Sequence, residues 1–284
     1  MSIKKALDMI DILVPVLVKD LETWDLILRL GRIRRSCATH NKTISGRVVK
    51  MITIKDLAKE IFIASEEGSV LTEMGRIDSI LRQPTSYIAK EYPSLDPETD
   101  VNTLIEIFHN LSLECIVLSR EDLVIGVVSE NSLIESLENI FPIDAPVIEI
   151  ATREIDYVDQ DASIAEVIGL MIQRGFRRMP IKDSEGKIIG ITTMLDIINE
   201  LAEIFSRNRE LTSIDILTRP ISQVRNIRRP LFIDPETSIR EASKKILEDN
   251  TGCAILGTEK DPKGLVTERD LIKTLRKLIY QTTD

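Results

Sequence analysis

Four short motifs in the sequence place a hydroxyl side chain three residues before a polar or acidic one. They are TIKD at 53–56, SENS at 129–132, TMLD at 193–196 and TERD at 267–270. Such a pair can cap the start of a helix, because the hydroxyl accepts a bond from the third backbone N–H and an acidic third residue suits the helix dipole. The same side chains could instead form part of a ligand site. Taken alone, the motif favours the cap, since such signatures mark many helix starts.

The spacing of the motifs indicates a chain built from repeats. Their first residues lie 76, 64 and 74 positions apart, so the first motif pairs with the second and the third with the fourth. A longer repeat is superimposed, because LDPETDV at 95–101 returns 138 positions later as IDPETSI at 233–239. Self-similarity at a fixed period identifies a repeat architecture. We interpret both heptapeptides as the turn into a helix, with a proline stiffening the approach and Asp100 or Ser238 near the helix start.

The segment before the third motif predicts the first elements of one repeat. Ile155 and residues 157–158 favour a short strand, Ser163 is the expected cap of a helix, and Gly175 ends that helix. The apolar face of the helix has the i, i+3, i+4, i+7, i+8 spacing of Ile164, Val167, Ile168, Met171 and Ile172. In the first repeat we expect Trp24 to take the place of Ile164 and to pack in the core.

Two strands and a second helix complete the repeat. The strands cover residues 177–182 and 187–192, joined by a turn at 183–186 whose glycine tolerates positive φ. The helix follows with an apolar face formed by Leu195, Ile198 and Leu201. The repeat is therefore a β-α-β-β-α unit.

The size of this unit predicts how the repeats assemble. A unit of about sixty residues cannot bury both faces of its sheet alone, so burial against a sibling is expected. We predict an α+β fold of four β-α-β-β-α units packed as two pseudo-symmetric pairs. The first pair occupies residues 1–140, with units at about 7–66 and 78–140, and the second occupies 141–284, with units at about 147–206 and 212–280.

Cysteine and histidine usage predicts no metal site. Cys37, Cys115 and Cys253 fall at equivalent strand positions, so we expect three small buried hydrophobes and neither a disulfide framework nor a metal knuckle. His40 and His109 have no second ligand nearby in the sequence, which favours core or surface roles.

Composition points to a compact protein of the cytoplasm. The chain has 284 residues, 43% of them hydrophobic, and a net charge of −9. That net negative charge argues against broad nucleic-acid binding. We interpret one local run of basic residues as a solvated loop; the run comprises Arg219, Arg225, Arg228 and Arg229. No apolar stretch approaches the twenty or so residues of a membrane helix, and the N-terminus lacks a signal-peptide core. We therefore expect no membrane partner.

The four units resemble the cystathionine-β-synthase (CBS) domain family, arranged as two tandem pairs, or Bateman modules. The resemblance lies in units that end in Gly-x-x-Thr-x-x-Asp: GITTMLD, GLVTERD, KMITIKD without the glycine and GVVSENS without the aspartate. It covers nearly the whole chain, from about residue 7 to 280. The resemblance implies a non-catalytic regulatory protein that binds AMP, ADP or ATP in clefts between paired repeats and signals energy state to a protein partner.

The resemblance also implies site residues. In this family the aspartate binds the ribose 2′ and 3′ hydroxyls, which suits a carboxylate with two acceptor oxygens, and the Thr or Ser faces the phosphate. The matching residues are Thr53, Asp56, Thr193, Asp196, Thr267 and Asp270. Ser132 replaces the aspartate in the second repeat, so that site is expected to be weak, empty or differently used.

Phosphate and adenine contacts follow from the same resemblance. The family places basic residues on the second strand to meet phosphate oxygens, and here these are Arg34, Arg35, Arg177 and Arg178. Alternate side chains of a strand point to opposite faces, so one arginine of each pair could face solvent instead. Members of the family also place an apolar side chain against the adenine ring. Ile155 matches that position, although it could instead pack in the core.

Other functions stay open at this point. No catalytic triad, paired catalytic carboxylates, Walker loop or metal cluster appears in the sequence, so we expect no enzyme. One alternative is a structural scaffold whose motifs serve only as caps. Another is a sensor of S-adenosylmethionine, whose sulfonium would gain little from the arginines. A DNA-binding regulator is disfavoured, because the repeats use up the chain. Both a disc closed by one chain and a homodimer fit the two pairs.

Overall fold

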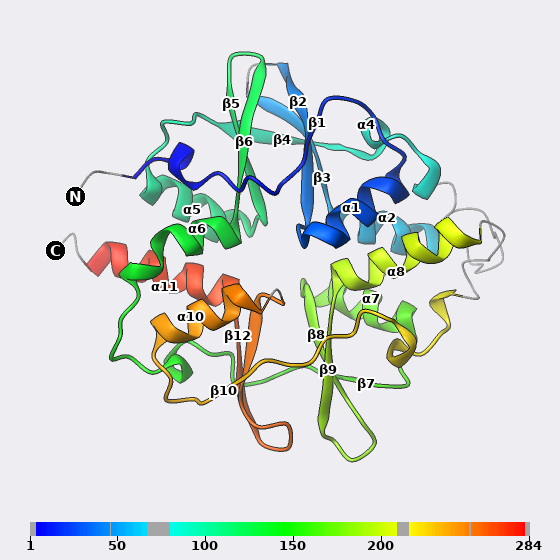
Figure 1. The fold of residues 1–284 in the computed structure, drawn as a ribbon, viewed down its shortest axis with the longest axis vertical. Coiled ribbons are helices and arrows are strands. Elements are labelled where there is room, and N and C mark those ends of the chain that lie inside the picture. Colours follow the sequence, from blue (N-terminus) through cyan, green and yellow to red (C-terminus); the bar gives the residue numbers. More distant parts are fainter. Residues whose placement is uncertain (1–3, 46, 67–79, 209–215, 250, 282–284) are drawn as a thin grey trace.

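The computed structural model describes residues 4–45, 47–66, 80–208, 216–249 and 251–281. It contains four similar units in two halves, one above the other in Figure 1. The predicted starts of the second and fourth repeats, at residues 78 and 212, lie outside the described residues. The predicted α+β architecture of β-α-β-β-α units is confirmed by the element order of each unit.

The N-terminal half holds units one and two. Unit one follows the short helix η1 (Ala6–Met9) and consists of β1 (Val16–Leu17), α1 (Thr23–Ile33), β2 (Cys37–Ser45), β3 (Val48–Thr53) and α2 (Ile54–Glu66). Unit two consists of α4 (Thr85–Ile88), β4 (Lys90–Leu95), α5 (Val101–Leu111), β5 (Cys115–Arg120), β6 (Leu123–Ser129), α6 (Glu130–Leu137) and η2 (Glu138–Ile140).

The C-terminal half holds units three and four. Unit three consists of η3 (Val147–Glu149), β7 (Val158–Asp159), α7 (Ile164–Arg174), β8 (Arg178–Lys182), β9 (Ile188–Thr193) and α8 (Met194–Arg207). Unit four consists of η4 (Ile221–Gln223), β10 (Phe232–Ile233), α10 (Ile239–Glu248), β11 (Cys253–Gly257), β12 (Pro262–Thr267) and α11 (Glu268–Gln281).

The sheets follow one rule in every unit. The first strand pairs parallel with the second, and the second pairs antiparallel with the third, as in β7-β8-β9 and β10-β11-β12. In the N-terminal half β3 also pairs with β4, so that β1 to β6 form one six-stranded sheet. Apolar side chains between the paired units form a small core in each half, for example around Val49 and Val117 and around Ile191 and Ile255.

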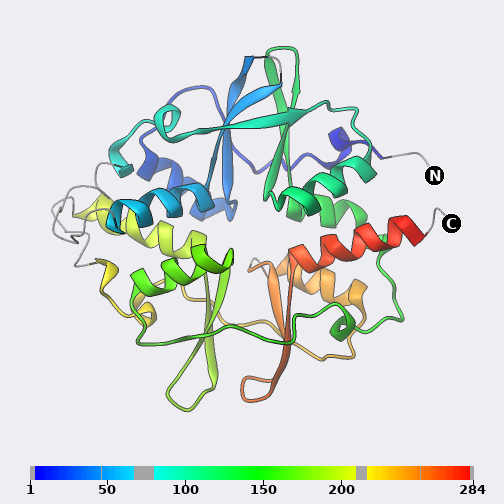
Figure 2. The ribbon, with the colours of Figure 1, turned by 180° about the vertical axis from the view of Figure 1, so that it is seen from behind.

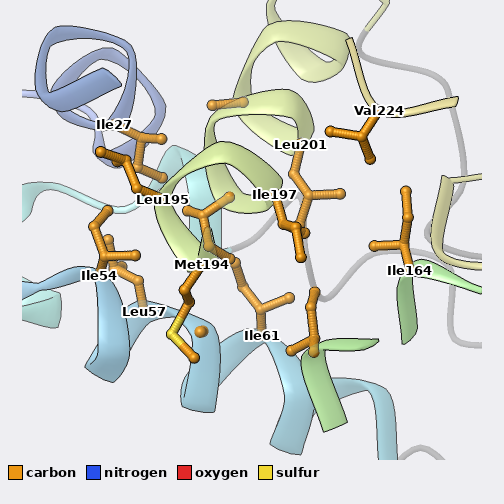
Figure 3. Packing of buried hydrophobic residues seen from close by; sticks show 14 of the residues in the cluster. Ile27, Ile54, Leu57, Ile61, Ile164, Met194, Leu195, Ile197, Leu201 and Val224 are labelled. Atoms are coloured by element: carbon orange, nitrogen blue, oxygen red, sulfur yellow. The ribbon is translucent and has the colours of Figure 1, made fainter. Parts of the chain in front are cut away.

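The helices of the two halves pack against each other. Unit one lies on unit three through α1, α2, α7 and α8, and unit two lies on unit four through α5, α6, α10 and α11 (Figures 1 and 2). Figure 3 shows Ile54, Leu57 and Ile61 of α2 facing Met194 and its neighbours on α8. Each helix layer therefore buries its apolar face only when both halves are present.

The helix signals in unit three are confirmed, whereas the first strand begins only at Val158 and does not include Ile155. The hydroxyl of Ser163 accepts from Glu166 N, and Gly175 ends α7 with a φ of 70°. The expected position of Trp24 is wrong by one residue. The buried face of α1 starts at Thr23, whose hydroxyl donates to the carbonyl of Gln83 at 2.8 Å and so tolerates burial. The ring of Trp24 is partly buried at the side, 6.5 Å from the ring of Phe205.

The repeated heptapeptides are helix-entry turns, as predicted. Asp100 caps α5 and Ser238 caps α10. The turns also support the segment that enters each half, because the carbonyl of Thr99 accepts from Ala6 N and that of Thr237 accepts from Val147 N, each at 2.8 Å. The heptapeptide therefore has the same structural role in both halves, where it supports the entering segment.

The expectation for the cysteines is wrong in two of three cases. Cys37 of β2 and Cys115 of β5 form a disulfide, because the paired sheets bring their Cα atoms to 6.7 Å although they lie 78 residues apart. In the C-terminal half Arg178 stands opposite its motif threonine, where Cys37 stands in unit one, so Cys253 stays free and buried. Among the helices in the described ranges, none has the length and apolar character needed to span a membrane.

Candidate functional site

The four motifs all stand at the junction between a third strand and a second helix. Thr53, Ser129, Thr193 and Thr267 end β3, β6, β9 and β12, and α2, α6, α8 and α11 begin at the next residue. These helices start near the middle of the molecule and run toward its rim (Figure 1). The positive ends of four helices and the four motifs therefore meet in one region.

The motifs do cap their helices, but in units three and four the cap uses only one of the two carboxylate oxygens of the aspartate. In unit three Asp196 Oδ2 accepts from the backbone N and the hydroxyl of Thr193, at 3.1 and 2.6 Å. In unit four Asp270 Oδ2 accepts from the same two groups of Thr267, at 3.0 and 2.8 Å. The other carboxylate oxygen, Oδ1, takes no part in either cap. Cap and ligand site are thus compatible roles for one side chain.

Unit four has a pocket that its motif aspartate lines. The pocket has a volume of about 230 Å³ and is lined by five of the residues that the sequence predicted for ligand binding: Ile155, Arg177, Arg178, Thr267 and Asp270. They come from the segment before β7, from the residue before β8 and its first residue, from the end of β12 and from α11. Among the described residues, the partner of Asp270 Oδ1 is Lys273, whose Nζ lies 3.5 Å away and whose side chain is half exposed.

The two arginines of this pocket are engaged on its inner side. Arg177 pairs with Glu130 and lies 3.9 Å from Glu114, and Arg178 pairs with Glu268. Burial disfavours the charge of Arg177, but the neighbouring carboxylates outweigh it and raise the pKa of Arg177 above its ordinary value. Phosphate would have to compete with these carboxylates.

Two cations of the pocket were missed from the sequence, Arg269 and Lys273. Burial and then the charge of Arg177 lower the pKa of Arg269, and its described hydrogen bond is to the carbonyl of Ser112 at 3.3 Å. In the described part of the chain no carboxylate lies within ion-pair distance of Arg269. A bound anion would therefore stabilise it. The available signal was the cation inside TERD, followed by a lysine one turn later on the same helix.

The equivalent site of unit three is closed. Asp196 has no exposed surface, and its Oδ1 accepts from Arg34 Nη1 at 2.7 Å and lies 3.5 Å from Arg228 Nε. One predicted phosphate residue, Arg34, is thus bonded to one predicted ribose residue. Arg228 is part of the basic run that was interpreted as solvated, and for this residue that interpretation is wrong.

Unit one also engages its aspartate internally. Asp56 Oδ2 accepts from the hydroxyls of Thr53, at 2.7 Å, and Tyr92, at 2.5 Å, and Lys90 Nζ lies 3.6 Å from Oδ1. Burial, followed by the bond to Asp56, raises the pKa of Tyr92, which keeps its hydroxyl protonated as a donor. Neither oxygen of Asp56 is free of a partner.

Unit two replaces its missing aspartate from another segment. Ser129 and Ser132 form a capping box, and Ser129 Oγ donates to Asp11 Oδ2 at 2.6 Å. Arg35 Nε donates to the same oxygen at 2.6 Å. Asp11 is buried and lies before unit one in the sequence. The site that was expected to be weak, empty or differently used is therefore engaged within the chain.

All four predicted phosphate arginines line one central cavity. This cavity has a volume of about 110 Å³ and also contains Glu114, Glu130 and Glu268. Each arginine is paired with a carboxylate of the chain itself. The tertiary structure thus gathers the arginines at the centre and neutralises them there. Within the described ranges, no group of three or more His, Cys, Asp or Glu side chains could hold a metal ion.

Comparison with known proteins gives matches over most of the chain. The CBS domain family model matches residues 85–139, 147–203 and 221–277. An uncharacterised 33.4 kDa protein in the ribosomal RNA operon of Thermofilum pendens is 24% identical over 263 residues, covering 89% of this chain and 85% of the relative. An uncharacterised 17.7 kDa protein of Acidianus ambivalens is 29% identical over 96 residues, covering 34% of this chain and 57% of the relative.

A solved structure extends the likeness over the whole fold. Protein MJ1225 of Methanocaldococcus jannaschii, described as a proposed archaeal homologue of g-AMPK, superposes with a TM-score of 0.76 at 17% identity, covering 96% of this chain and 100% of that chain. At this identity the likeness concerns the fold. The family match itself spans more than half of the 284 residues, and the chain belongs to the CBS domain family.

Proposed function

We propose that this protein is a non-catalytic regulatory module that binds an adenine nucleotide in the pocket at Asp270 and transmits its occupancy to a protein partner. The observation that carries the proposal is the pocket of unit four, where Ile155, Thr267 and Asp270 line one hollow of about 230 Å³. These residues come from separate segments of the chain, and in the family they contact adenine, phosphate and ribose.

The pocket suits the three parts of a nucleotide. Asp270 Oδ1 is an acceptor held in place by the cap on Oδ2, and a ribose diol can displace the half-exposed amine of Lys273. Ile155, Pro180 and Leu265 provide apolar surface for a base. Arg269 and Lys273 supply positive charge for phosphate, with Arg177 and Arg178 behind them.

Helix α11 provides a route from the pocket to the other half. It carries Asp270, packs on α5, and joins it through Arg276, whose Nε donates to Glu106 Oε1 at 2.7 Å. A nucleotide can change the relation of the halves only through different affinity for two arrangements of these elements. The likeness to the proposed homologue of g-AMPK supports a role in which a partner reads that change.

The proposal extends to the N-terminal segment. The family model matches from residue 85 onward, yet unit one has the same element order as the three matched units. We interpret unit one as a fourth CBS repeat and residues 1–140 and 141–284 as two Bateman modules. A truncated chain of residues 141–284 would not test this interpretation, since its helices lose the layer they pack against.

The deciding experiment is thermal unfolding of nucleotide-free protein with AMP, ADP, ATP, GTP and S-adenosylmethionine. A ligand at a hundred times its dissociation constant adds about 2.7 kcal/mol to stability. We expect a shift with adenine nucleotides, its loss in Asp270→Asn and its retention in Asp196→Asn, each compared with its own ligand-free protein. No shift with any compound would contradict the proposal.

One observation favours a second function. In units one, two and three the polar atoms of the motif are all engaged within the chain, which is what a structural scaffold requires. A scaffold predicts unchanged melting with every nucleotide. A shift with S-adenosylmethionine alone would instead indicate the sulfonium ligand, which the cations Arg269 and Lys273 disfavour.

A further inference from the structure

One backbone position recurs beside the motif in all four units. It is held by Lys90, Asp11, Arg228 and Thr152 for units one to four, and we name it the pairing position. Its main chain bonds to the third-strand residue two places before the motif hydroxyl: Met51, Val127, Ile191 and Leu265. The position is filled from a segment outside the unit's own hairpin, so the motif sequence does not determine it.

In three units the pairing position carries a charge that reaches the motif. Lys90 Nζ lies 3.6 Å from Asp56 Oδ1, and Arg228 Nε lies 3.5 Å from Asp196 Oδ1. In unit two, where the motif ends in Ser132, the sign is reversed and Asp11 accepts from Ser129 at 2.6 Å. The charge is a cation where the motif has an aspartate and an anion where it has none.

Unit four differs at this position. Thr152 is short, neutral and exposed, and its described hydrogen bonds are the two main-chain bonds with Leu265, both at 2.9 Å. It lines the pocket together with Asp270. Nothing from the pairing position reaches Oδ1 of the unit four aspartate, whose partner Lys273 comes from the same helix.

The residue before the pairing position shows the same contrast. Ile10 and Ile227 cover the strand glycines Gly126 and Gly190, reaching within 2.7 and 2.5 Å of where a Cβ would stand. At Gly264 the corresponding residue is Ala151, whose Cβ is 3.0 Å away. A hollow beside Arg34 and Arg228 also exists in unit three, but neither Thr193 nor Asp196 lines it. A small residue thus accompanies the open site and large ones the closed sites of units two and three, whereas in unit one the small Ala89 precedes Lys90.

We propose that the pairing position decides which sites admit a nucleotide, so that Thr152 leaves unit four open and Lys90, Asp11 and Arg228 act as internal occupants of the other three. This rests on the proposed function. A ligand at Asp196 would have to separate a fully buried carboxylate from two guanidiniums, which costs more than two ribose hydrogen bonds return. One chain therefore binds one nucleotide.

The test transfers the charge of a closed unit to the open one. Thr152→Arg copies unit three and Thr152→Lys copies unit one, while Thr152→Val keeps the size of threonine and serves as the matched control. Titration calorimetry of the full, nucleotide-free chain with AMP measures affinity and stoichiometry. Because Thr152 is exposed, the ligand-free melting temperature should stay within a degree or two in all three variants.

We expect one AMP per wild-type chain and at least tenfold weaker binding in Thr152→Arg and Thr152→Lys, with Thr152→Val close to wild type. Two or more sites in the wild type would overturn the inference, and so would unchanged affinity in both charged variants. If AMP, ADP and ATP all fail to bind the wild type, the proposed function is refuted instead, so the two failures are distinguishable.

Discussion

Asp196 and Asp270 hold the same place in sister units, yet their surroundings are opposite. Both cap a helix through Oδ2 with a threonine three residues earlier. Asp196 is fully buried, and its Oδ1 is bonded by Arg34, which lies 162 residues away in the sequence. Asp270 borders a pocket, and its Oδ1 meets only the exposed amine of Lys273 among the described residues. A motif therefore determines a cap locally, while remote residues determine whether it can also bind.

The largest expected effect is a difference in the stability lost when each of the two aspartates is replaced. Asp196→Asn leaves the guanidiniums of Arg34 and Arg228 around a neutral amide, and we expect a loss of about 4 kcal/mol in the free energy of unfolding. Asp270→Asn should cost about 1 kcal/mol, because only a cap weakens. Urea denaturation measures both. Equal losses in the two variants would show that the ion pairs of Asp196 add nothing to stability beyond a helix cap.

The next effect extends the comparison to the two halves. Opening the Cys37–Cys115 bond, through Cys37→Ser with Cys115→Ser, should lower stability by about 3 kcal/mol, since the bond closes a loop of 78 residues. AMP affinity at Asp270 should change little, because the bond lies in the other half. Wild type treated with dithiothreitol should match the double variant, which itself should not respond. Large loss of binding would indicate that the halves are coupled through this bond.

A third effect concerns the aspartate of unit one. Tyr92→Phe removes the hydroxyl that donates to Asp56, and we expect a loss of about 1 kcal/mol at pH 7. Because the pKa of Tyr92 is raised by burial and by Asp56, this contribution is fully present below the ordinary tyrosine pKa and is lost as pH rises above it. The difference between wild type and Tyr92→Phe should therefore shrink above about pH 10. A constant difference across that range would argue against the bond.

The smallest effect sharpens the assignment of phosphate charge. Lys273→Ala should weaken AMP binding roughly threefold, as expected for one exposed charge. Calorimetry at low and high salt should show the difference fading with ionic strength. Lys244→Ala, on the exposed surface of α10, is the matched control and should leave affinity unchanged. Tighter binding in Lys273→Ala would mean that the amine competes with ribose for Asp270 more than it attracts phosphate.

Local patterns explain which predictions are confirmed. The cap at Ser163, the end of α7 at Gly175 and the entry turns at Asp100 and Ser238 depend on neighbours within a few residues. The error at Trp24 has a non-local origin, because burial of Thr23 depends on its bond to Gln83, which lies 60 residues away in the sequence. The disulfide and the arginine pairs join residues from different units, and no local pattern identifies such partners.

By itself, the sequence determined the four β-α-β-β-α units, their pairing by spacing, and the caps at the four motifs, because helix periodicity and capping act over a few residues. Ile155, Thr267 and Asp270 were named as site residues only through the family resemblance, and their meeting in one pocket was not predicted. Only the tertiary structure decided which aspartate lines a pocket together with Ile155. Asp11, Arg34 and Arg228 reach their motifs from other segments, and buried charges must find partners wherever the packed chain brings them.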